Sequence, residues 1–318
     1  MTETLPRIVF MGTPEFAVAS LRALHQAGCD VAAVVTVPDR PAGRGQKLTF
    51  SPVKEYALEH GLTILQPEKL RDPVFNETLK NHKADLFVVV AFRMLPEAVW
   101  SLPPLGTFNL HASLLPQYRG AAPINHAVIN GEPKTGVTTF LIDKDIDTGM
   151  ILLSRETEIA PDETAGSLHD RLMEIGAQLA VETAEGLYAR RLKPVPQTIT
   201  SGDMLRTAPR IFPADTVIHW REPAGKVHNF IRGLSPYPGA MTILHRGNRS
   251  FRLKVLEGRL IDHIRDIPGT LSVADRNRFI VSCLSGGIEI LTLVPEGRKR
   301  MSSAEFLRGF DIEGWEVD

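Results

Sequence analysis

The run Leu86–Ala91, LFVVVA, constrains the fold more than any other stretch of this chain, because it has no polar face. A strand that is apolar on both sides must be covered on both faces, as in parallel sheets flanked by two layers of helices. Hydrophobic residues make up 43% of the 318 residues and charged residues 23%, which is ordinary for a globular protein with a sizeable core. We therefore expect a layered α/β architecture.

Strand and helix patterns alternate on both sides of this run. We predict strands at Ile8–Met11, Val31–Thr36, Thr63–Leu65, Thr107–His111, Gly136–Ile142 and Met150–Ile159. We predict helices from Phe16 to Gly28, at Pro52–His60, Asp72–His82 and Pro123–Asn130, and from Thr164 to about residue 188. Thr13 is expected to cap the first helix, with Pro14 and Glu15 in its first turn. This alternation predicts a doubly wound, mostly parallel sheet. No G-x-G-x-x-G follows the first strand, so a dinucleotide site is not expected.

The pattern changes near residue 190. Residues 190–213 carry Arg190, Arg191, Lys193 and several prolines without any periodicity, which indicates a linker. One helical stretch, Ala224–Arg232, and a series of short alternating runs follow, and these predict a small β-barrel. We therefore expect a first domain at residues 1–189, a linker at 190–213 and a second, β-rich domain at 214–318.

Composition excludes several classes of protein. The two cysteines, Cys29 and Cys283, lie far apart in apolar settings, so we expect reduced, buried thiols and no disulfide framework. No Cys/His cluster has zinc spacing, and no bound metal is expected. No apolar run approaches the roughly 20 residues of a membrane span, and the first residues do not resemble a signal peptide, so we expect a cytoplasmic protein. The net charge of −1 gives no nucleic-acid signal over the whole chain.

The predicted strand at Thr107–His111 carries the first candidate site residues. Asn109 and His111 are two apart, so their side chains leave the same face of the strand. They also lie at its carboxyl end, where open α/β sheets usually bind ligands. An amide that can donate and an imidazole that can take a proton suit acyl transfer.

A histidine in this role needs a carboxylate to stabilise its charged form. The stretch Ile142–Gly149, IDKDIDTG, supplies three. We favour Asp147, which stands in the turn just before the strand predicted at Met150. On sequence alone Asp143 and Asp145 remain competing candidates.

The stretch Val37–Ser51 has no hydrophobic period, so we predict a long loop without regular structure. It carries the cations Arg40, Arg44 and Lys47 against a single acid, Asp39. Such a loop is either a solvated surface segment or a basic arm that contacts phosphates.

Two motifs together resemble the folate-dependent formyltransferases: NLHASLLPQYRGAAP at Asn109–Pro123, and the D-x-D-T-G that ends at Gly149. Gly12–Phe16, GTPEF, and Pro38–Gly45, PDRPAGRG, resemble the methionyl-tRNA formyltransferases within that family. The likeness runs from Arg7 to Pro295. It implies that the formyl group of 10-formyltetrahydrofolate is transferred to the α-amine of initiator methionyl-tRNA, without a metal or a covalent enzyme intermediate.

The resemblance also assigns residues. It implies catalytic roles for Asn109, His111 and Asp147, and a folate-binding segment made of Ser113, Leu114, Leu115 and Pro116. It implies that the loop with Arg40, Arg44 and Lys47 enters the tRNA acceptor end, where Arg44 matches the key arginine. The second domain would be an OB-like barrel that holds the tRNA, and we expect a monomer. Relatives carry a Tyr-Gly pair near Phe92–Arg93, a departure that concerns the shape of the folate pocket.

Three alternatives stay open from the sequence. A formyltransferase for an amino sugar nucleotide would share the Asn-x-His pair and the aspartate but would lack the PDRPAGRG loop. A glycinamide ribonucleotide formyltransferase would be shorter and would lack the second domain. A non-catalytic module that binds tRNA or folate is the third, although the chain retains all three catalytic candidates.

Overall fold

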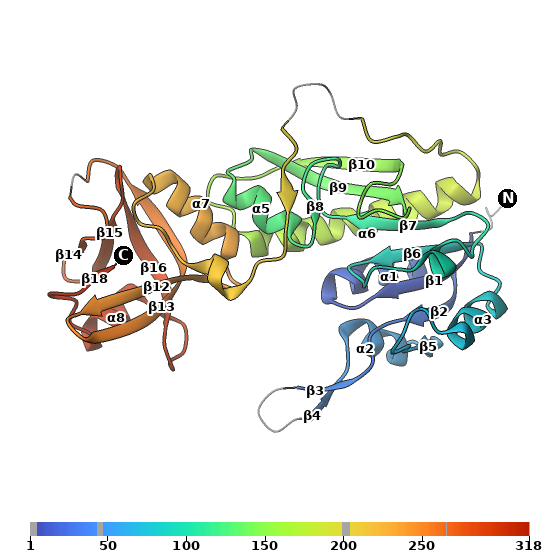
Figure 1. Ribbon diagram of the computed structural model, residues 1–318, viewed down its shortest axis with the longest axis horizontal. Helices are drawn as coiled ribbons and strands as arrows, with labels where there is room; N and C mark the ends of the chain where they lie inside the picture. Colours follow the sequence, from blue (N-terminus) through green and yellow to red (C-terminus); the bar gives the residue numbers. More distant parts are fainter. Residues whose placement is uncertain (1–4, 43–46, 199–203, 265, 318) are drawn as a thin grey trace. The chain divides into compact units, whose positions relative to one another are not determined.

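The computed structural model describes residues 5–42, 47–198, 204–264 and 266–317, and the chain divides into two compact units (Figure 1). The first unit comprises Met1–Gly120, Thr135–Thr157 and His169–Thr207. The second comprises Ala121–Lys134, Glu158–Leu168 and Ala208–Asp318. Two short segments from the middle of the chain, Ala121–Lys134 and Glu158–Leu168, therefore pack with the C-terminal residues. The single linker expected at residues 190–213 stays a prediction.

A seven-stranded sheet forms the centre of the first unit, in the order β10-β9-β7-β6-β1-β2-β5. Neighbouring strands from β5 to β7 run parallel, and β9 runs antiparallel to β7. The predicted doubly wound, mostly parallel sheet is confirmed. Its strands are β1 (Arg7–Gly12), β2 (Asp30–Val35), β5 (Ile64–Leu65), β6 (Leu86–Val90), β7 (Thr107–His111), β9 (Lys134–Leu141) and β10 (Ile151–Glu158).

Helices cover both faces of this sheet, as the apolar run predicted. On one face Val9, Met11 and Val89 pack with side chains of α3 and α4. On the other face Leu110 contacts Gly176 of α6 so closely that a Cβ there would lie 2.8 Å from it. All five residues of β6 are consequently buried. The helices of this unit are α1 (Glu15–Ala27), α2 (Pro52–Glu59), α3 (Pro73–Asn81), α4 (Glu97–Trp100) and α6 (Ala165–Tyr188).

Two local predictions were wrong. Thr13 does not cap α1, because Pro14 occupies the N-cap position and no side-chain hydrogen bond is made there. The segment Val37–Ser51 is not free of regular structure, since β3 (Arg40–Ala42) pairs antiparallel with β4 (Lys47–Thr49) and sets Arg40 opposite Thr49. Strands of three residues are too short to carry a detectable period.

The second unit contains an antiparallel sheet in the order β14-β15-β16-β13-β12-β18. Register shifts near Glu257 bend β13, and a bridge between Thr270 and Glu316 brings the two edges together. The sheet thus curls into the predicted OB-like barrel. Its strands are β12 (Ala240–Arg246), β13 (Arg249–Ile261), β14 (Leu271–Ala274), β15 (Arg278–Ser282), β16 (Gly287–Pro295), β17 (Met301–Ser302) and β18 (Glu316–Val317).

Six further elements complete the fold of the described residues. They are β8 (Arg119–Gly120), β11 (Thr207–Ala208), a 3-10 helix at Pro213–Thr216, and the helices α5 (Pro123–Ile129), α7 (Ala224–Leu234) and α8 (Ser303–Gly309). As predicted, Cys29 and Cys283 are free and buried, and burial raises the pKa of the two thiols to about 11 and about 12. Within the described ranges, no helix is long and apolar enough to span a membrane.

We predict that Thr242→Val destabilises the second unit by about 1–3 kcal/mol, because it leaves a buried donor unpaired. Trp220 is fully buried, and its indole N–H donates to Thr242 Oγ1 at 2.9 Å. The change preserves side-chain shape. Urea unfolding monitored by tryptophan fluorescence measures the decrease in the free energy of unfolding. The matched control is Thr292→Val, whose hydroxyl bonds the exposed Glu257 and should cost less than about 0.5 kcal/mol.

Candidate active site

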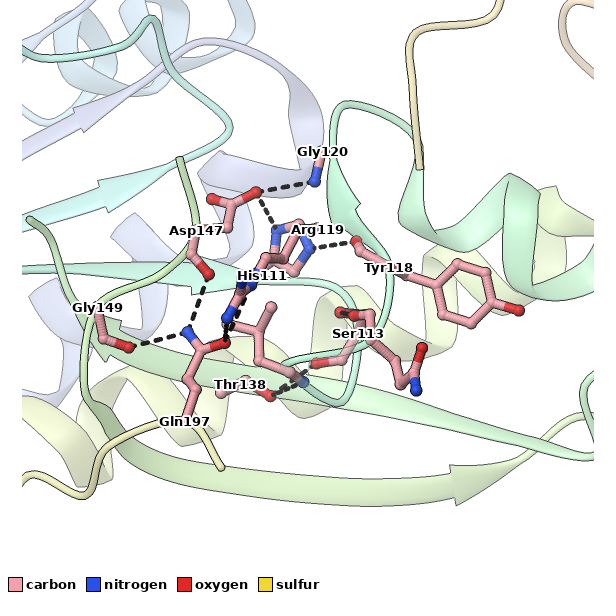
Figure 2. Close-up of polar contacts among 11 residues, drawn as sticks. His111, Ser113, Tyr118, Arg119, Gly120, Thr138, Asp147, Gly149 and Gln197 are labelled. Carbon is pink, nitrogen blue, oxygen red and sulfur yellow. Dashed lines mark hydrogen bonds and ion pairs between the residues drawn. The ribbon is translucent and has the colours of Figure 1, made fainter. Parts of the chain in front are cut away.

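His111 is the centre of the candidate site, at the last residue of β7. Its side chain is only 7% exposed, and its Nε2 lies 2.9 Å from the main-chain carbonyl oxygen of Tyr118 (Figure 2). A carbonyl oxygen can only accept, so Nε2 must carry a proton. Nδ1 is then the atom of the neutral ring that can take up another proton.

Asp147 lies against that second nitrogen. Its Oδ2 is 3.8 Å from Nδ1 of His111, and the carboxylate side chain is 14% exposed (Figure 2). The same oxygen accepts a hydrogen bond of 2.9 Å from the main-chain N–H of Gly120. The carboxylate is thus held where it attracts a proton on Nδ1 of His111.

The other two acidic candidates of this turn are placed differently. Asp143 Oδ1 accepts from the N–H of Asp145 at 3.0 Å and from the hydroxyl of Thr148 at 2.8 Å, so Asp143 stabilises the turn itself. Asp145 is exposed. Of the three carboxylates, Asp147 is the one that the structure brings beside His111.

The turn that carries Asp147 has an unusual backbone. Asp147 adopts a φ of +54°, in the left-handed region that residues with a side chain seldom occupy. Gly149 packs so tightly that a Cβ on it would lie 1.6 Å from the carbonyl oxygen of Leu141. The glycine of the D-x-D-T-G motif is therefore a packing requirement.

Asn109 lies two residues before His111 on β7, and it pairs in register with Val89 of β6. The strand alternation places both site residues on one face, as predicted. The Asn109 side chain is half-buried, and none of the described residues forms a hydrogen bond with it. Its amide is thus available to donate to a ligand.

The predicted folate segment forms the loop after β7. The hydroxyl of Ser113 donates to the carbonyl of Gln117 at 2.6 Å, and its own carbonyl accepts from Thr138 Oγ1 at 2.7 Å. Ser113 and Leu115 are buried, whereas Leu114 and Pro116 are partly exposed. The buried pair shapes the loop, and the other two side chains are accessible.

The basic arm is anchored at its start. Asp39 accepts hydrogen bonds from Lys54 and Gln66, and these two, Lys54 first, lower the pKa of its carboxyl group. Arg40 is exposed beside this anchor. Arg44 lies outside the described residues, and so does the side chain of Lys47.

Arg93 adds positive charge near this arm. Its guanidinium donates to the main-chain carbonyls of Pro67 and Glu68, at 2.9 and 3.2 Å. Burial, and then the charge of Arg40, lower the pKa of Arg93. Arg93 therefore lies close enough to Arg40 for their charges to interact.

Sequence reasoning missed Tyr118 and Gln197. Tyr118 acts through its main chain, which no side-chain pattern can signal. It has a φ of +59°, its N–H donates to the carbonyl of Arg206 at 2.7 Å, and its carbonyl accepts from His111. Gln197 bonds the main chain of the Asp147 turn (Figure 2).

The fold corresponds to that of known formyltransferases. The formyl transferase family model matches residues 6–184, and the model for the formyl transferase C-terminal domain matches residues 210–311. Among solved structures, WlaRD, a sugar 3N-formyl transferase, superposes with a TM-score of 0.65 over 93% of this chain and all of its own. An N-formyltransferase from Helicobacter canadensis superposes with a TM-score of 0.64 over 89% of this chain and 98% of its own. Both are 20% identical to this chain, which shows a shared fold.

Sequence relatives are more specific. The methionyl-tRNA formyltransferase of Bacteroides thetaiotaomicron is 47% identical over 98% of both chains. That of Flavobacterium johnsoniae is 46% identical over 95% of this chain and 96% of its own. The chain therefore belongs to the formyltransferase family, on the branch of the methionyl-tRNA formyltransferases, which confirms the resemblance seen in the motifs.

We predict that Gly149→Ala destabilises the first unit by about 1–3 kcal/mol or more, because the new methyl group meets the backbone of Leu141. Displacement of the Asp147 turn should also reduce catalytic activity. Denaturant unfolding and steady-state kinetics measure the two effects. Gly225→Ala is the control, since a Cβ at Gly225 meets nothing within 4 Å. Equal stability of the two variants would contradict the described packing.

Proposed function

We propose that this protein transfers the formyl group of 10-formyltetrahydrofolate to the free α-amine of initiator methionyl-tRNA. The product, N-formylmethionyl-tRNA, serves translation initiation. Identity of 46–48% to methionyl-tRNA formyltransferases over nearly the whole chain supports this substrate pair. The observation that carries the chemistry is the cluster of Asn109, His111 and Asp147 at the carboxyl end of β7.

The reaction forms a bond between the amine nitrogen and the formyl carbon and breaks the bond between that carbon and the folate nitrogen. Negative charge develops on the formyl oxygen, and the Asn109 amide can donate to it. The attacking nitrogen loses a proton and the folate nitrogen gains one. Nδ1 of His111 can carry this proton, since Tyr118 keeps the other nitrogen protonated throughout. Asp147 stabilises the ring while it is charged.

The folate co-substrate is proposed to lie at the carboxyl ends of β6 and β7. These strands are parallel neighbours in which Val90 pairs with Leu110, so Ala91 and Phe92 leave the sheet at the level of His111. The accessible apolar side chains of Leu114 and Pro116 suit a flat ring. The buried Nε of Arg93 has no hydrogen-bond partner among the described residues, so the residues present fit a polar ligand here. When bound, this co-substrate supplies the formyl carbon.

The tRNA is proposed to contact both units. The arm with Arg40, Arg44 and Lys47 would bind phosphates of the acceptor stem, and the additional charge of Arg93 near Arg40 supports this role. The OB-like barrel of the second unit would hold the body of the tRNA, a ligand class that such barrels bind in other proteins. We further propose that the protein acts in the cytoplasm as a monomer.

A sugar nucleotide is the alternative acceptor, because the structural neighbours named above include a sugar formyltransferase. Release of tetrahydrofolate, measured with methionyl-tRNA and separately with an amino sugar nucleotide as acceptor, decides between them. Turnover with methionyl-tRNA alone is expected. Turnover only with the sugar nucleotide would reverse the assignment.

We predict that Asn109→Ala, His111→Ala and Asp147→Asn each lower kcat by about 10²–10³-fold while the fold is retained. Each removes a group assigned to the developing charge or to the moving proton. Single-turnover kinetics with saturating substrates measure the loss, and circular dichroism checks the fold. Asp145→Asn, which changes an exposed carboxylate of the same turn, is the control. If Asp145→Asn lowered kcat while Asp147→Asn had normal activity, the catalytic role would belong to Asp145 and not to Asp147.

We predict that Arg40→Ala and Arg44→Ala weaken methionyl-tRNA binding without changing the KM for the formyl donor. If each arginine meets one phosphate, either change should reduce the slope of log affinity against log salt concentration by about 0.7–0.9. Filter binding at several salt concentrations measures this slope. Lys80→Ala removes an exposed cation of α3 and should leave the slope unchanged. If both arginine variants kept the salt dependence of the wild type, the arm would not bind phosphates of the tRNA.

A further inference from the structure

Gln197 contacts the turn that carries Asp147, although it lies fifty residues further along the chain. Its side-chain Nε2 donates two hydrogen bonds of 2.9 Å, to the main-chain carbonyls of Asp147 and Gly149 (Figure 2). These carbonyls flank Thr148. The side chain thus spans the turn and holds it on both sides of its central residue.

Arg119 fixes the orientation of this amide. Nε and Nη2 of Arg119 lie 3.1 and 2.5 Å from Oε1 of Gln197 (Figure 2). A guanidinium only donates, so the atom that it contacts must be the amide oxygen. The NH₂ group then faces the two carbonyls, which only accept. In this orientation the oxygen and the NH₂ group of the Gln197 amide both have complementary partners. If the amide were flipped, its NH₂ group would face the guanidinium and its oxygen would face the two carbonyls.

The same short segment also holds the carboxylate. Gly120, the residue after Arg119, donates its main-chain N–H to Oδ2 of Asp147. Arg119 therefore fixes the main chain of Asp147 through Gln197, while Gly120 fixes its side chain. A residue with a φ of +54° keeps that conformation only where its surroundings determine it.

We propose that Gln197 is a positioning residue of the formyl-transfer site, oriented by Arg119, which keeps the carboxylate of Asp147 beside Nδ1 of His111. The proposal rests on the proposed function, in which Asp147 stabilises the charged imidazole. In this proposal Gln197 acts on the Asp147 turn and not on either substrate. Its loss should therefore lower kcat and leave both KM values unchanged.

The backbone at Gln197 is secured without its side chain. Val195 and Ile151 exchange two main-chain hydrogen bonds of 2.8 Å, two residues before Gln197. A side-chain substitution at Gln197 should thus leave the segment attached to β10. This separates a loss of positioning from a loss of folding.

The first test compares Gln197→Met with Thr198→Ala. Methionine has a similar shape and no amide, whereas Thr198 is an exposed neighbour. Gln197→Met should lower kcat up to about 10²-fold, since small misplacement of a reacting group has effects of this size. Gln197→Glu, which keeps an acceptor for Arg119 and lacks the NH₂ donor, should not restore kcat. Thr198→Ala should match the wild type. Wild-type kcat in Gln197→Met, or a rise confined to KM, would overturn the proposal.

The second test is a double-mutant cycle with Asp147→Asn. If Gln197 acts through Asp147, Gln197→Met should have little further effect once the carboxylate is gone. If the two substitutions lowered kcat independently, so that their fold-losses multiplied in the double variant, the positioning role would be overturned. Full activity of Asp147→Asn alone would instead refute the role proposed for Asp147. An impaired Asp147→Asn with a fully active Gln197→Met would refute only the present inference.

Discussion

The antiparallel pairing of β9 with β7 is the constraint on which the candidate site depends. Phe108 is in register with Leu141, and His111 with Thr138, so β9 ends beside the start of β7. His111, however, stands at the other end of β7. The turn that follows β9 must carry Asp147 back along β7 by three residues, which is about 10 Å at the rise of a β-strand. A carboxylate reaches His111 only because this turn folds back along the direction of β7.

The unusual features of the turn follow from this path. Asp143 closes it from within, by accepting from Asp145 and Thr148. Gly149 lets the backbone pass against the carbonyl of Leu141, where a side chain would not fit. Gly120 and Gln197 then hold Asp147 from outside the turn. Apart from the side-chain bond between Thr148 and Asp143, each of these contacts involves main-chain atoms, so the position of the carboxylate depends on the backbone path as a whole.

Local patterns in the sequence predicted those structural features that depend on residues close together in the chain. The unbroken apolar run at Leu86–Ala91 predicted a strand buried on both faces, and alternation placed Asn109 and His111 together. Alternation could not choose among three carboxylates, because their distances from His111 are set by the fold-back of the turn. Gln197 gave no signal, since it lies in a segment without periodicity and acts on main-chain carbonyls. Pro14, which was expected in the first turn of α1, instead occupies its N-cap position, so the helix begins one residue later than a cap at Thr13 would place it.

The hydrogen bond from His111 to Tyr118 decides how the site can handle a proton. With Nε2–H committed to the carbonyl, the lone pair of the neutral ring points toward the carboxylate of Asp147. A proton carried on Nδ1 is attracted by this carboxylate. The separation of 3.8 Å between Nδ1 and the carboxylate exceeds a hydrogen bond and leaves room for adjustment when that proton arrives. In the proposed reaction the attacking amine loses a proton as the new amide bond forms, and we propose that this pair receives it. The buried setting strengthens the resulting attraction, because solvent screens it little.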